Sequence, residues 1–348
     1  MSAESLPSTL GLPDRGGPRQ PLIDARDLTC HFPVRGGVMG SKRVVRAVDG
    51  VSFSIAKGET LGVVGESGCG KSTTARLLIG LIPPTGGSIL YDGQELGADL
   101  SLRELRRGVQ MVFQDSYASL NPRLTVEDSI AFGPMVNGVE RGEARRIARD
   151  LLERIGLDPA RFAGRYPHEL SGGQRQRVNI GRALAMRPSL VILDEAVSAL
   201  DKSVEAQVLN LLADLRRDFD LTYMFISHDL NVVRFVSDQL MVMYLGEVVE
   251  IGPAETLRVE HRHPYTSALF AAMPSMDPDR RTETPPLAGD PPNPIDPPSG
   301  CRFHTRCPFA EPVCGRTVPR LREVATDMPH RVACHMGDPE SGHQGAGL

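Results

Sequence analysis

The sequence contains no apolar run long enough to cross a membrane, and it lacks a secretion signal. A membrane-spanning helix needs roughly 20 consecutive apolar residues, and no run here approaches that length. The first residues, MSAESLPSTLGLPDRGG, have neither the basic start nor the apolar core of a signal peptide. We therefore expect the chain to remain in the cytosol, and we expect any membrane pore to come from other chains.

A strong net charge is also absent. The formal charge is −4 over 348 residues, of which 24% are charged and 41% are hydrophobic. This balance provides no general attraction to nucleic acid or to an anionic membrane. The composition is typical of a globular protein, and the length allows one large domain or two ordinary ones.

Cysteine is scarce until the end of the chain. Only Cys30 and Cys69 precede residue 300. The other four of the six cysteines lie in the tail at Cys301, Cys307, Cys314 and Cys334. Structural disulfides are rare in the cytosol, so the cluster favours metal ligands over disulfides. Its spacing, C-x5-C-x6-C-x19-C, contains no close pair typical of zinc sites. The residues leave open a [4Fe–4S] cluster, Zn²⁺ or unligated thiols.

The sequence does contain an alternation of short apolar strands and helices. The runs TLGVVG (60–65), LVILDEA (190–196) and TYMFISH (222–228) have the continuous apolar character of buried parallel strands. Residues 143–155 repeat apolar residues on one helical face. Upstream, LIDARDLTCHF and AVDGVSFSI alternate apolar and polar residues, which predicts a β region. Together these patterns predict an α/β fold with a parallel sheet covered by helices.

Residues 65–72, GESGCGKS, match the pattern of a phosphate-binding loop between a strand and a helix. Glycines let the backbone direct its N–H groups at phosphate oxygens, and the following helix directs its positive end at the same anion. We expect Lys71 to reach the β- and γ-phosphates and Ser72 to bind Mg²⁺, with Cys69 as a small filler. The predicted nucleotide-binding residues here are Gly65, Ser67, Gly68, Cys69, Gly70, Lys71, Ser72 and Thr73.

Two adjacent carboxylates, Asp194 and Glu195, end the predicted strand at 190–196. At a strand end both side chains can reach one nucleotide, although successive side chains point in opposite directions. We predict that Asp194 holds Mg²⁺ through water. Glu195 is the predicted general base, which polarises the water that attacks the γ-phosphate.

The segment LSGGQRQRV, at 170–178, resembles the signature sequence of ABC-type ATPases. The resemblance extends from residue 22 to about residue 256. It implies that Gln114 is the glutamine of the family's Q-loop, with a catalytic role and a place among the Mg²⁺ ligands. It also implies that His228 is the catalytic switch histidine, and that Phe32 stacks on adenine.

The start of the signature segment is a second predicted anion-binding site. Ser171, Gly172, Gly173 and Gln174 open a helix whose N-terminal end attracts phosphate. Two phosphate sites for one nucleotide make sense if each chain offers its signature to the phosphate-binding loop of a partner. We therefore expect ATP to lie between two ATPase subunits.

The resemblance implies the fold in more detail. It is a P-loop NTPase of the ABC ATPase type, with a helical signature subdomain, an antiparallel β region and a small Cys-rich C-terminal lobe. We expect a disordered tail over 1–20 and the ATPase domain over 21–256, with its helical subdomain at about 115–180. An extension follows over 257–348, with a proline-rich linker at 277–299 and the cysteine cluster at 301–334.

Two further segments narrow the subfamily. DSYASLNPR (115–123) and HRHPYTSALFAAMP (261–274) resemble the ATPase subunits of dipeptide and oligopeptide importers, the first segment more closely in the second of their two ATPase types. Tails of that family hold a [4Fe–4S] cluster, so the resemblance implies one here, with a structural role. It also implies a location at the cytoplasmic face of the cell membrane. The implied partners are a second, non-identical ATPase subunit, two permease subunits and an extracytoplasmic peptide-binding protein.

Other functions remain as alternatives. Related importers for glycans, nickel or glutathione share this architecture. Soluble ABC ATPases of DNA repair or translation usually carry two cassettes or a long coiled coil, and this chain has one phosphate-binding loop and no heptad run. A regulatory iron–sulfur sensor with an inert cassette is disfavoured because Lys71, Asp194, Glu195 and His228 are all present.

Overall fold

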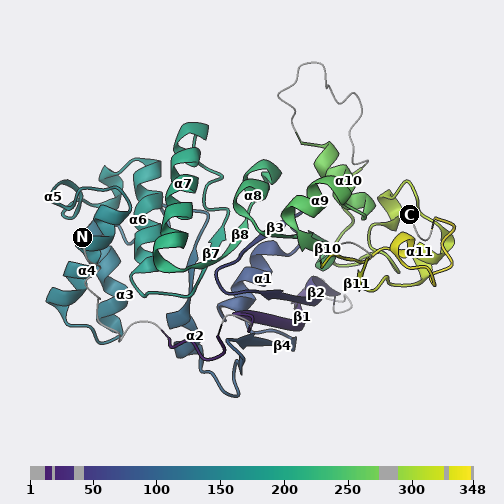
Figure 1. Ribbon diagram of the computed structural model, residues 1–348, viewed down its shortest axis with the longest axis horizontal. Helices are drawn as coiled ribbons and strands as arrows, with labels where there is room; N and C mark the ends of the chain where they lie inside the picture. The colour runs from purple at the N-terminus through teal and green to yellow at the C-terminus, as the bar shows by residue number, and fades with distance from the viewer. Residues whose placement is uncertain (1–11, 18–19, 35–42, 274–288, 325–328, 346–348) are drawn as a thin grey trace. The chain divides into compact units, whose positions relative to one another are not determined.

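The described chain divides into two compact units. The computed structural model describes residues 12–17, 20–34, 43–273, 289–324 and 329–345 (Figure 1). Unit 1 comprises Met1–Asp24, Ser54–Glu59 and Leu90–Ser227. Unit 2 comprises Ala25–Phe53, Thr60–Ile89 and His228–Leu348.

Unit 1 contains three parallel strands, β6 (Val109–Val112), β7 (Leu190–Asp194) and β8 (Thr222–Ile226), with β7 in the middle. Every residue of β7 and β8 is buried. A strand that is covered on both faces must be apolar throughout, so the two strands read as continuous apolar runs in the sequence. The predicted buried strands at these two positions are confirmed.

In unit 1, α2 precedes β6, the helices α3 to α6 lie between β6 and β7 in the sequence, and α7 connects β7 to β8. In Figure 1, α3, α4 and α6 lie side by side, and they pack against one another. The apolar residues of α4 are buried on one face, as the periodicity of 143–155 predicts. The bounds are α2 (Leu102–Gly108), α3 (Val126–Val136), α4 (Arg141–Arg154), α5 (Pro159–Phe162), η1 (Pro167–Glu169), α6 (Gly172–Leu184) and α7 (Lys202–Phe219).

Unit 2 contains a mixed sheet that ends in the tail of the chain. Strand β3 (Thr60–Val64) pairs in parallel with β9 (Gln239–Tyr244), and β9 pairs antiparallel with β10 (Glu247–Pro253). Beyond β10 the tail adds the short antiparallel strands β12 (Arg331–Val332) and β11 (Arg322–Glu323). The predicted apolar strand at 60–65 is confirmed as β3, all of whose residues are buried.

A second sheet has the strand order β2-β1-β4-β5. Its strands are β1 (Ile23–Val34), β2 (Arg43–Ile55), β4 (Gly86–Tyr91) and β5 (Gln94–Glu95), so the predicted β-rich start is confirmed. The helices of unit 2 are α1 (Lys71–Leu78), α8 (Leu230–Val236), α9 (Ala254–Glu260), α10 (Pro264–Ala271), η2 (His304–Arg306), α11 (Pro312–Arg316) and η3 (His335–Gly337).

The described part of the tail is built into unit 2. The amide of Ala333 donates to the carbonyl oxygen of Val249 at 2.8 Å, in β10. His330 Nε2 lies 2.8 Å from Glu250 Oε1, and both side chains are fully buried. A tail with few aliphatic residues gains order by adding to a neighbouring sheet, and a separate Cys-rich lobe is therefore not supported.

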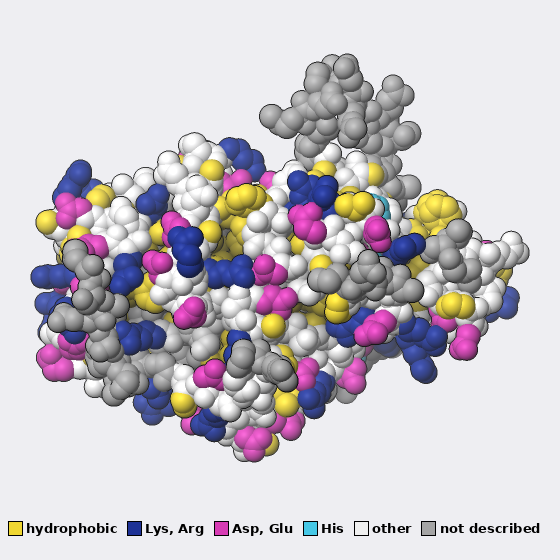
Figure 2. Space-filling model, in the orientation of Figure 1, with side chains coloured by type: hydrophobic (Ala, Val, Ile, Leu, Met, Phe, Trp, Pro, Cys, Tyr) yellow, Lys and Arg dark blue, Asp and Glu magenta, His cyan; other side chains and the backbone are white. Residues whose placement is uncertain are grey.

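Two sequence predictions fall partly outside the described residues. Residues 1–11 and 18–19, within the tail predicted over 1–20, and residues 277–288, within the linker predicted over 277–299, are not described. The described residues 289–299 contain no helix or strand. Over the described ranges, no helix is both long and apolar enough to cross a membrane. Figure 2 shows acidic and basic side chains interspersed on the visible face, which agrees with the small net charge.

Candidate functional site

The phosphate-binding loop connects β3 to α1, and its glycines are required by geometry. Gly65, Gly68 and Gly70 have φ values of 146°, 79° and 109°, a region that other residues rarely adopt. A Cβ atom on Gly65 would lie 2.2 Å from the carbonyl oxygen of Met243, and one on Gly70 would lie 2.3 Å from that of Ala47. The loop can therefore form its close turns only with glycine at these positions.

Lys71 is the first residue of α1, and its side chain folds back over the loop. Its Nζ donates to the carbonyl oxygen of Gly65 at 2.7 Å and to that of Glu66 at 3.0 Å. The side chain is 6% exposed, so the ammonium group is held at the loop rather than in solvent. Burial raises the pKa of the Cys69 thiol, which keeps it a neutral, space-filling side chain.

Four of the predicted Mg²⁺ and nucleotide residues lie in unit 2 and are partly or fully accessible. Ser72 and Thr73 are half-buried in the first turn of α1. His228 and Phe32 are exposed, the latter at 37% on β1, so neither is a core residue.

The carboxylates predicted at the end of β7 lie in unit 1. Asp194 is 5% exposed, and Glu195 follows it with a φ of 50°, an uncommon backbone conformation for a residue with a side chain. The Glu195 amide donates to the carbonyl oxygen of Ile226 at 2.9 Å. Gln114 Nε2 donates to Glu195 Oε2 at 2.8 Å, so the structure brings the predicted base and the predicted Q-loop glutamine together.

The signature segment opens α6 with a reciprocal cap. Ser171 Oγ accepts from the amide of Gln174 at 3.3 Å, and Gln174 Oε1 accepts from the amide of Ser171 at 3.0 Å. A Cβ atom on Gly173 would lie 2.4 Å from Val204 Cγ1 on α7. Gly172 is half-buried beside it, and the helix start is therefore a capped N-terminus with two small residues.

Sequence reasoning missed the residues that hold the phosphate-binding loop in place. The amide of Glu66 donates to Tyr265 Oη at 2.8 Å, and the Glu66 carboxylate pairs with Arg306 in the tail. The amide of Gly246 donates to the carbonyl oxygen of Cys69 at 2.9 Å. These partners lie far along the chain from the loop, and the local sequence around each of them does not indicate the contact.

The predicted metal cluster in the tail is contradicted. Cys301, Cys307, Cys314 and Cys334 line a small void of about 10 Å³ together with Phe303 and other side chains. Over the described ranges, no group of three or more His, Cys, Asp or Glu side chains could hold a metal ion. The predicted [4Fe–4S] cluster in the tail, and the zinc alternative for these cysteines, are therefore wrong.

Two thiols of the tail have raised pKa values. Burial raises the pKa of Cys301 to about 12 and that of Cys334 to about 11, because burial penalises the charged form. All six cysteines of the chain are free thiols, so the tail is held by packing and hydrogen bonds.

Known protein families match two parts of the chain. The family described as ABC transporter matches residues 48–198, and the family described as oligopeptide/dipeptide transporter, C-terminal region, matches residues 249–314. The oligopeptide transport ATP-binding protein AppF of Bacillus subtilis is 50% identical over 331 residues, which cover 91% of this chain and 98% of that protein. The probable peptide ABC transporter ATP-binding protein y4tS of Sinorhizobium fredii is 50% identical over 323 residues, covering 91% and 90%.

Solved structures show the same fold. The cbiO1 subunit of the cbiONQ ABC transporter complex of Clostridium perfringens has a TM-score of 0.59 and 27% identity, covering 70% of this chain and 92% of that one. A dimeric ATP-binding cassette in a post-hydrolysis state, bound to ADP and Pi, has a TM-score of 0.58 and 29% identity, covering 67% and 98%.

Fold, loop geometry and relatives together define the class as that of the ABC ATPases, which bind ATP with Mg²⁺ and hydrolyse it. Within this class, the chain belongs to the family of ATP-binding subunits of oligopeptide and dipeptide ABC transporters. The resemblance that the sequence motifs indicated is confirmed. Subunits of this kind work with membrane permeases.

Proposed function

We propose that this chain hydrolyses ATP to power the import of dipeptides and oligopeptides across the cytoplasmic membrane. The assignment of dipeptides and oligopeptides as the transported substrates rests on one observation. Residues 249–314 match the C-terminal region of oligopeptide and dipeptide transporters. That region begins in β10 and runs through α9, α10 and η2 into α11, so it is a substantial part of unit 2. The chain would act at the cytoplasmic face of the membrane.

The phosphate-binding loop would hold the triphosphate. Lys71 Nζ, which bonds the loop carbonyls of Gly65 and Glu66, would transfer to the β- and γ-phosphate oxygens when the nucleotide enters. The loop N–H groups and the N-terminus of α1 would contribute further positive potential. His228 would contact the γ-phosphate, and Phe32, being exposed, would be free to stack on adenine.

Mg²⁺ would neutralise charge on the β- and γ-phosphates during hydrolysis. The proposed ligands Ser72, Gln114 and Asp194 offer a hydroxyl, an amide and a carboxylate oxygen, and Mg²⁺ prefers oxygen ligands. Asp194 is 5% exposed at the end of β7, and its carboxylate oxygens are ligands of the kind that Mg²⁺ prefers.

Glu195 would accept the proton from the attacking water. Its carboxylate is oriented by the hydrogen bond from Gln114 Nε2, and its backbone is held by the bond to Ile226. A base fixed in this way needs little reorganisation before reaction. Gln114 lies in the Q-loop and binds the Glu195 carboxylate. A movement of the Q-loop would therefore shift the general base.

The segment from Tyr117 to Pro122 would contact the cytoplasmic helices of the permease. Tyr117 is 54% exposed, and its ring lies 5.5 Å from the guanidinium of Arg175 on α6. Asn179 Nδ2 donates to the carbonyl oxygen of Ser116 at 3.0 Å, also from α6. Through these two contacts the segment and α6 would move together. A movement of the permease against this segment would therefore be transmitted to the signature helix.

The complete importer would contain a second, non-identical ATPase subunit, two permease subunits and an extracytoplasmic peptide-binding protein. Ser171, Gly172, Gly173 and Gln174 would face the γ-phosphate of ATP that is bound to the partner ATPase. The capped start of α6 supports this role, because it is a second helix N-terminus available to an anion on the same chain.

The test is cargo-dependent ATP hydrolysis by the assembled importer. The chain is affinity-purified with its co-purifying subunits from native membranes, reconstituted in lipid discs, and supplied with its binding protein. We expect dipeptides or oligopeptides to stimulate hydrolysis, and we expect nickel, glutathione and glycans to leave it at the basal rate. Stimulation by one of those three cargoes alone, or co-purification without any permease, would contradict peptide import.

A further inference from the structure

A five-residue segment of the tail, 302–306, reaches the phosphate-binding loop. Arg306, the last residue of η2, binds both carboxylate oxygens of Glu66. Its Nη1 lies 2.8 Å from Glu66 Oε2, and its Nη2 lies 3.1 Å from Glu66 Oε1. The arginine side chain is 6% exposed and the glutamate side chain 22% exposed. A bidentate pair that is largely shielded from water is stronger and more directional than a surface ion pair.

Glu66 is held at every polar group that it has. Its amide donates to Tyr265 Oη at 2.8 Å, and its carbonyl oxygen accepts from Lys71 Nζ at 3.0 Å. Its carboxylate is bound by Arg306. One residue of the phosphate-binding loop is therefore tied to α10, to the loop lysine and to the tail, and its side chain would otherwise be free to turn toward the bound phosphates.

The arginine is itself fixed by an aromatic cluster. Phe303 is 2% exposed, and its ring centroid lies 5.3 Å from that of Tyr244 and 5.4 Å from that of Tyr265. Arg306 Nη1 also donates to Tyr244 Oη at 3.2 Å. The cluster prevents the segment 302–306 from sliding along the sheet, so Arg306 presents its guanidinium to Glu66 in one position.

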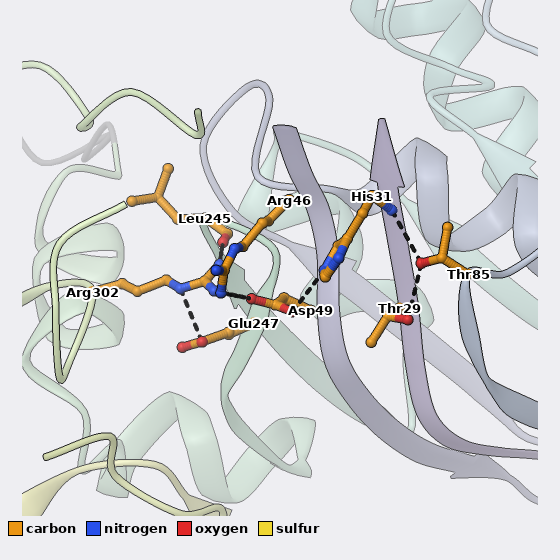
Figure 3. Close-up of polar contacts among 8 residues, drawn as sticks. All are labelled: Thr29, His31, Arg46, Asp49, Thr85, Leu245, Glu247 and Arg302. Carbon is orange, nitrogen blue, oxygen red and sulfur yellow. Dashed lines mark hydrogen bonds and ion pairs between the residues drawn. The ribbon is translucent and has the colours of Figure 1, made fainter. Parts of the chain in front are cut away.

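Arg302, in the same segment, is linked to Cys69 of the phosphate-binding loop through the turn between β9 and β10. Figure 3 shows Arg302 directed at Asp49, at Glu247 and at the carbonyl oxygen of Leu245, and its Nε lies 2.9 Å from Glu247 Oε1. Leu245 and Gly246 form the turn between β9 and β10. The amide of Gly246 donates to the carbonyl oxygen of Cys69 at 2.9 Å.

We propose that the tail segment 302–306 positions the phosphate-binding loop, and that Arg306 is a positioning residue for ATP through Glu66. An unpaired carboxylate beside the triphosphate would repel it and would leave the loop with more conformations to lose on binding. Arg306 removes both costs, because it neutralises the carboxylate and holds it away from the phosphates. The proposal rests on the assignment of this loop to ATP under the proposed function.

The test is equilibrium binding of a fluorescent ATP analogue with Mg²⁺ to the full-length chain. We expect Arg306→Gln to weaken binding about 10-fold and Arg306→Lys about 3-fold, since lysine keeps the charge and loses the bidentate geometry. Glu66→Gln should change binding by less than about 3-fold. The double variant Arg306→Gln, Glu66→Gln should bind within about 3-fold of the wild type, because the repelling charge is gone.

Adenosine separates positioning from a structural role. If Arg306 only stabilised the fold, Arg306→Gln would weaken the binding of adenosine as well as that of ATP. Adenosine, which has no phosphate, should bind Arg306→Gln as it binds the wild type. In the assembled transporter, Arg306→Gln should raise KM for ATP and leave kcat within about 2-fold.

Two controls make the outcome decisive. Arg322→Gln removes an ion pair of 2.9 Å with Asp338 elsewhere in the tail, and it should leave ATP affinity unchanged. Lys71→Ala should abolish ATP binding, and wild-type binding by that variant would overturn the ATP assignment of the loop itself. Two outcomes would overturn the positioning role and leave the ATP assignment of the loop intact. In the first, Lys71→Ala loses ATP binding while Arg306→Gln and Arg306→Lys bind ATP like the wild type. In the second, adding Glu66→Gln to Arg306→Gln does not restore ATP affinity.

Discussion

Phe303→Ala tests whether the tail is part of the core of unit 2. The side chain is 2% exposed, and it contacts the rings of Tyr244, Tyr265 and His263 at centroid distances of 5.3, 5.4 and 5.8 Å. Truncation of a buried phenylalanine to alanine costs about 3–5 kcal/mol, which includes the lost ring contacts. We expect a loss of about 4 kcal/mol in the free energy of unfolding.

The assay is urea unfolding followed by tyrosine fluorescence. The chain has no tryptophan and six tyrosines, two of which contact Phe303, so the signal reports on this core. With an m-value of about 3 kcal/mol per M, the midpoint should fall by about 1.3 M. Phe309→Ala is the matched control from the same tail, because that ring is 55% exposed, and it should cost less than about 1 kcal/mol. A Phe303→Ala variant that loses less than about 1 kcal/mol would refute the reasoning.

Four further outcomes follow from the site and its surroundings. Glu195→Gln should still bind ATP but should slow hydrolysis by the assembled importer about 100-fold or more, and turnover within a few-fold of wild type would rule out the general base. Gln114→Ala removes the 2.8 Å bond that orients this carboxylate, so kcat should fall about 10-fold with little change in ATP affinity, as steady-state kinetics would show. Burial beside Asp49 raises the pKa of Glu247 to about 7, above its usual value near 4.5. The folded state then binds more protons than the unfolded state between these values, so stability should fall as the pH rises from 4.5 to 7, and Glu247→Gln should flatten that slope in urea midpoints measured at pH 5 and pH 8. Treatment with a strong chelator should leave the urea midpoint unchanged, and a fall would show that the tail cysteines do hold a metal.

Local patterns predicted the elements whose structure depends on local constraints. Strand β7 could be predicted because both of its faces are covered, which requires an unbroken apolar run. Helix α4 could be predicted because one of its faces is buried, which repeats apolar residues at the helical period. The cap of α6 likewise lies within four residues, from Ser171 to Gln174.

The cysteine tail shows where local patterns were insufficient. Spacing gave four candidate ligands, but coordination depends on where the thiols point and on whether they ionise. The structure places them around a small void, where burial raises the pKa of Cys301 and of Cys334, and no metal-binding group forms over the described ranges. Both properties depend on packing between segments, and neither can be obtained from the interval between two residues.

By itself the sequence determined the phosphate-binding loop, since the glycines and Lys71 act within eight residues and backbone geometry admits few alternatives. It also determined the ABC family, because the motifs occur in a specific order. Only the tertiary structure decided that the tail belongs to the unit that carries this loop. The contact between Arg306 and Glu66 joins residues that are 240 positions apart, and it exists because Phe303 packs against Tyr244 and Tyr265. Such a pair leaves no periodic or local mark in the chain, since it is set by the packing of whole elements and not by the conformation of either segment.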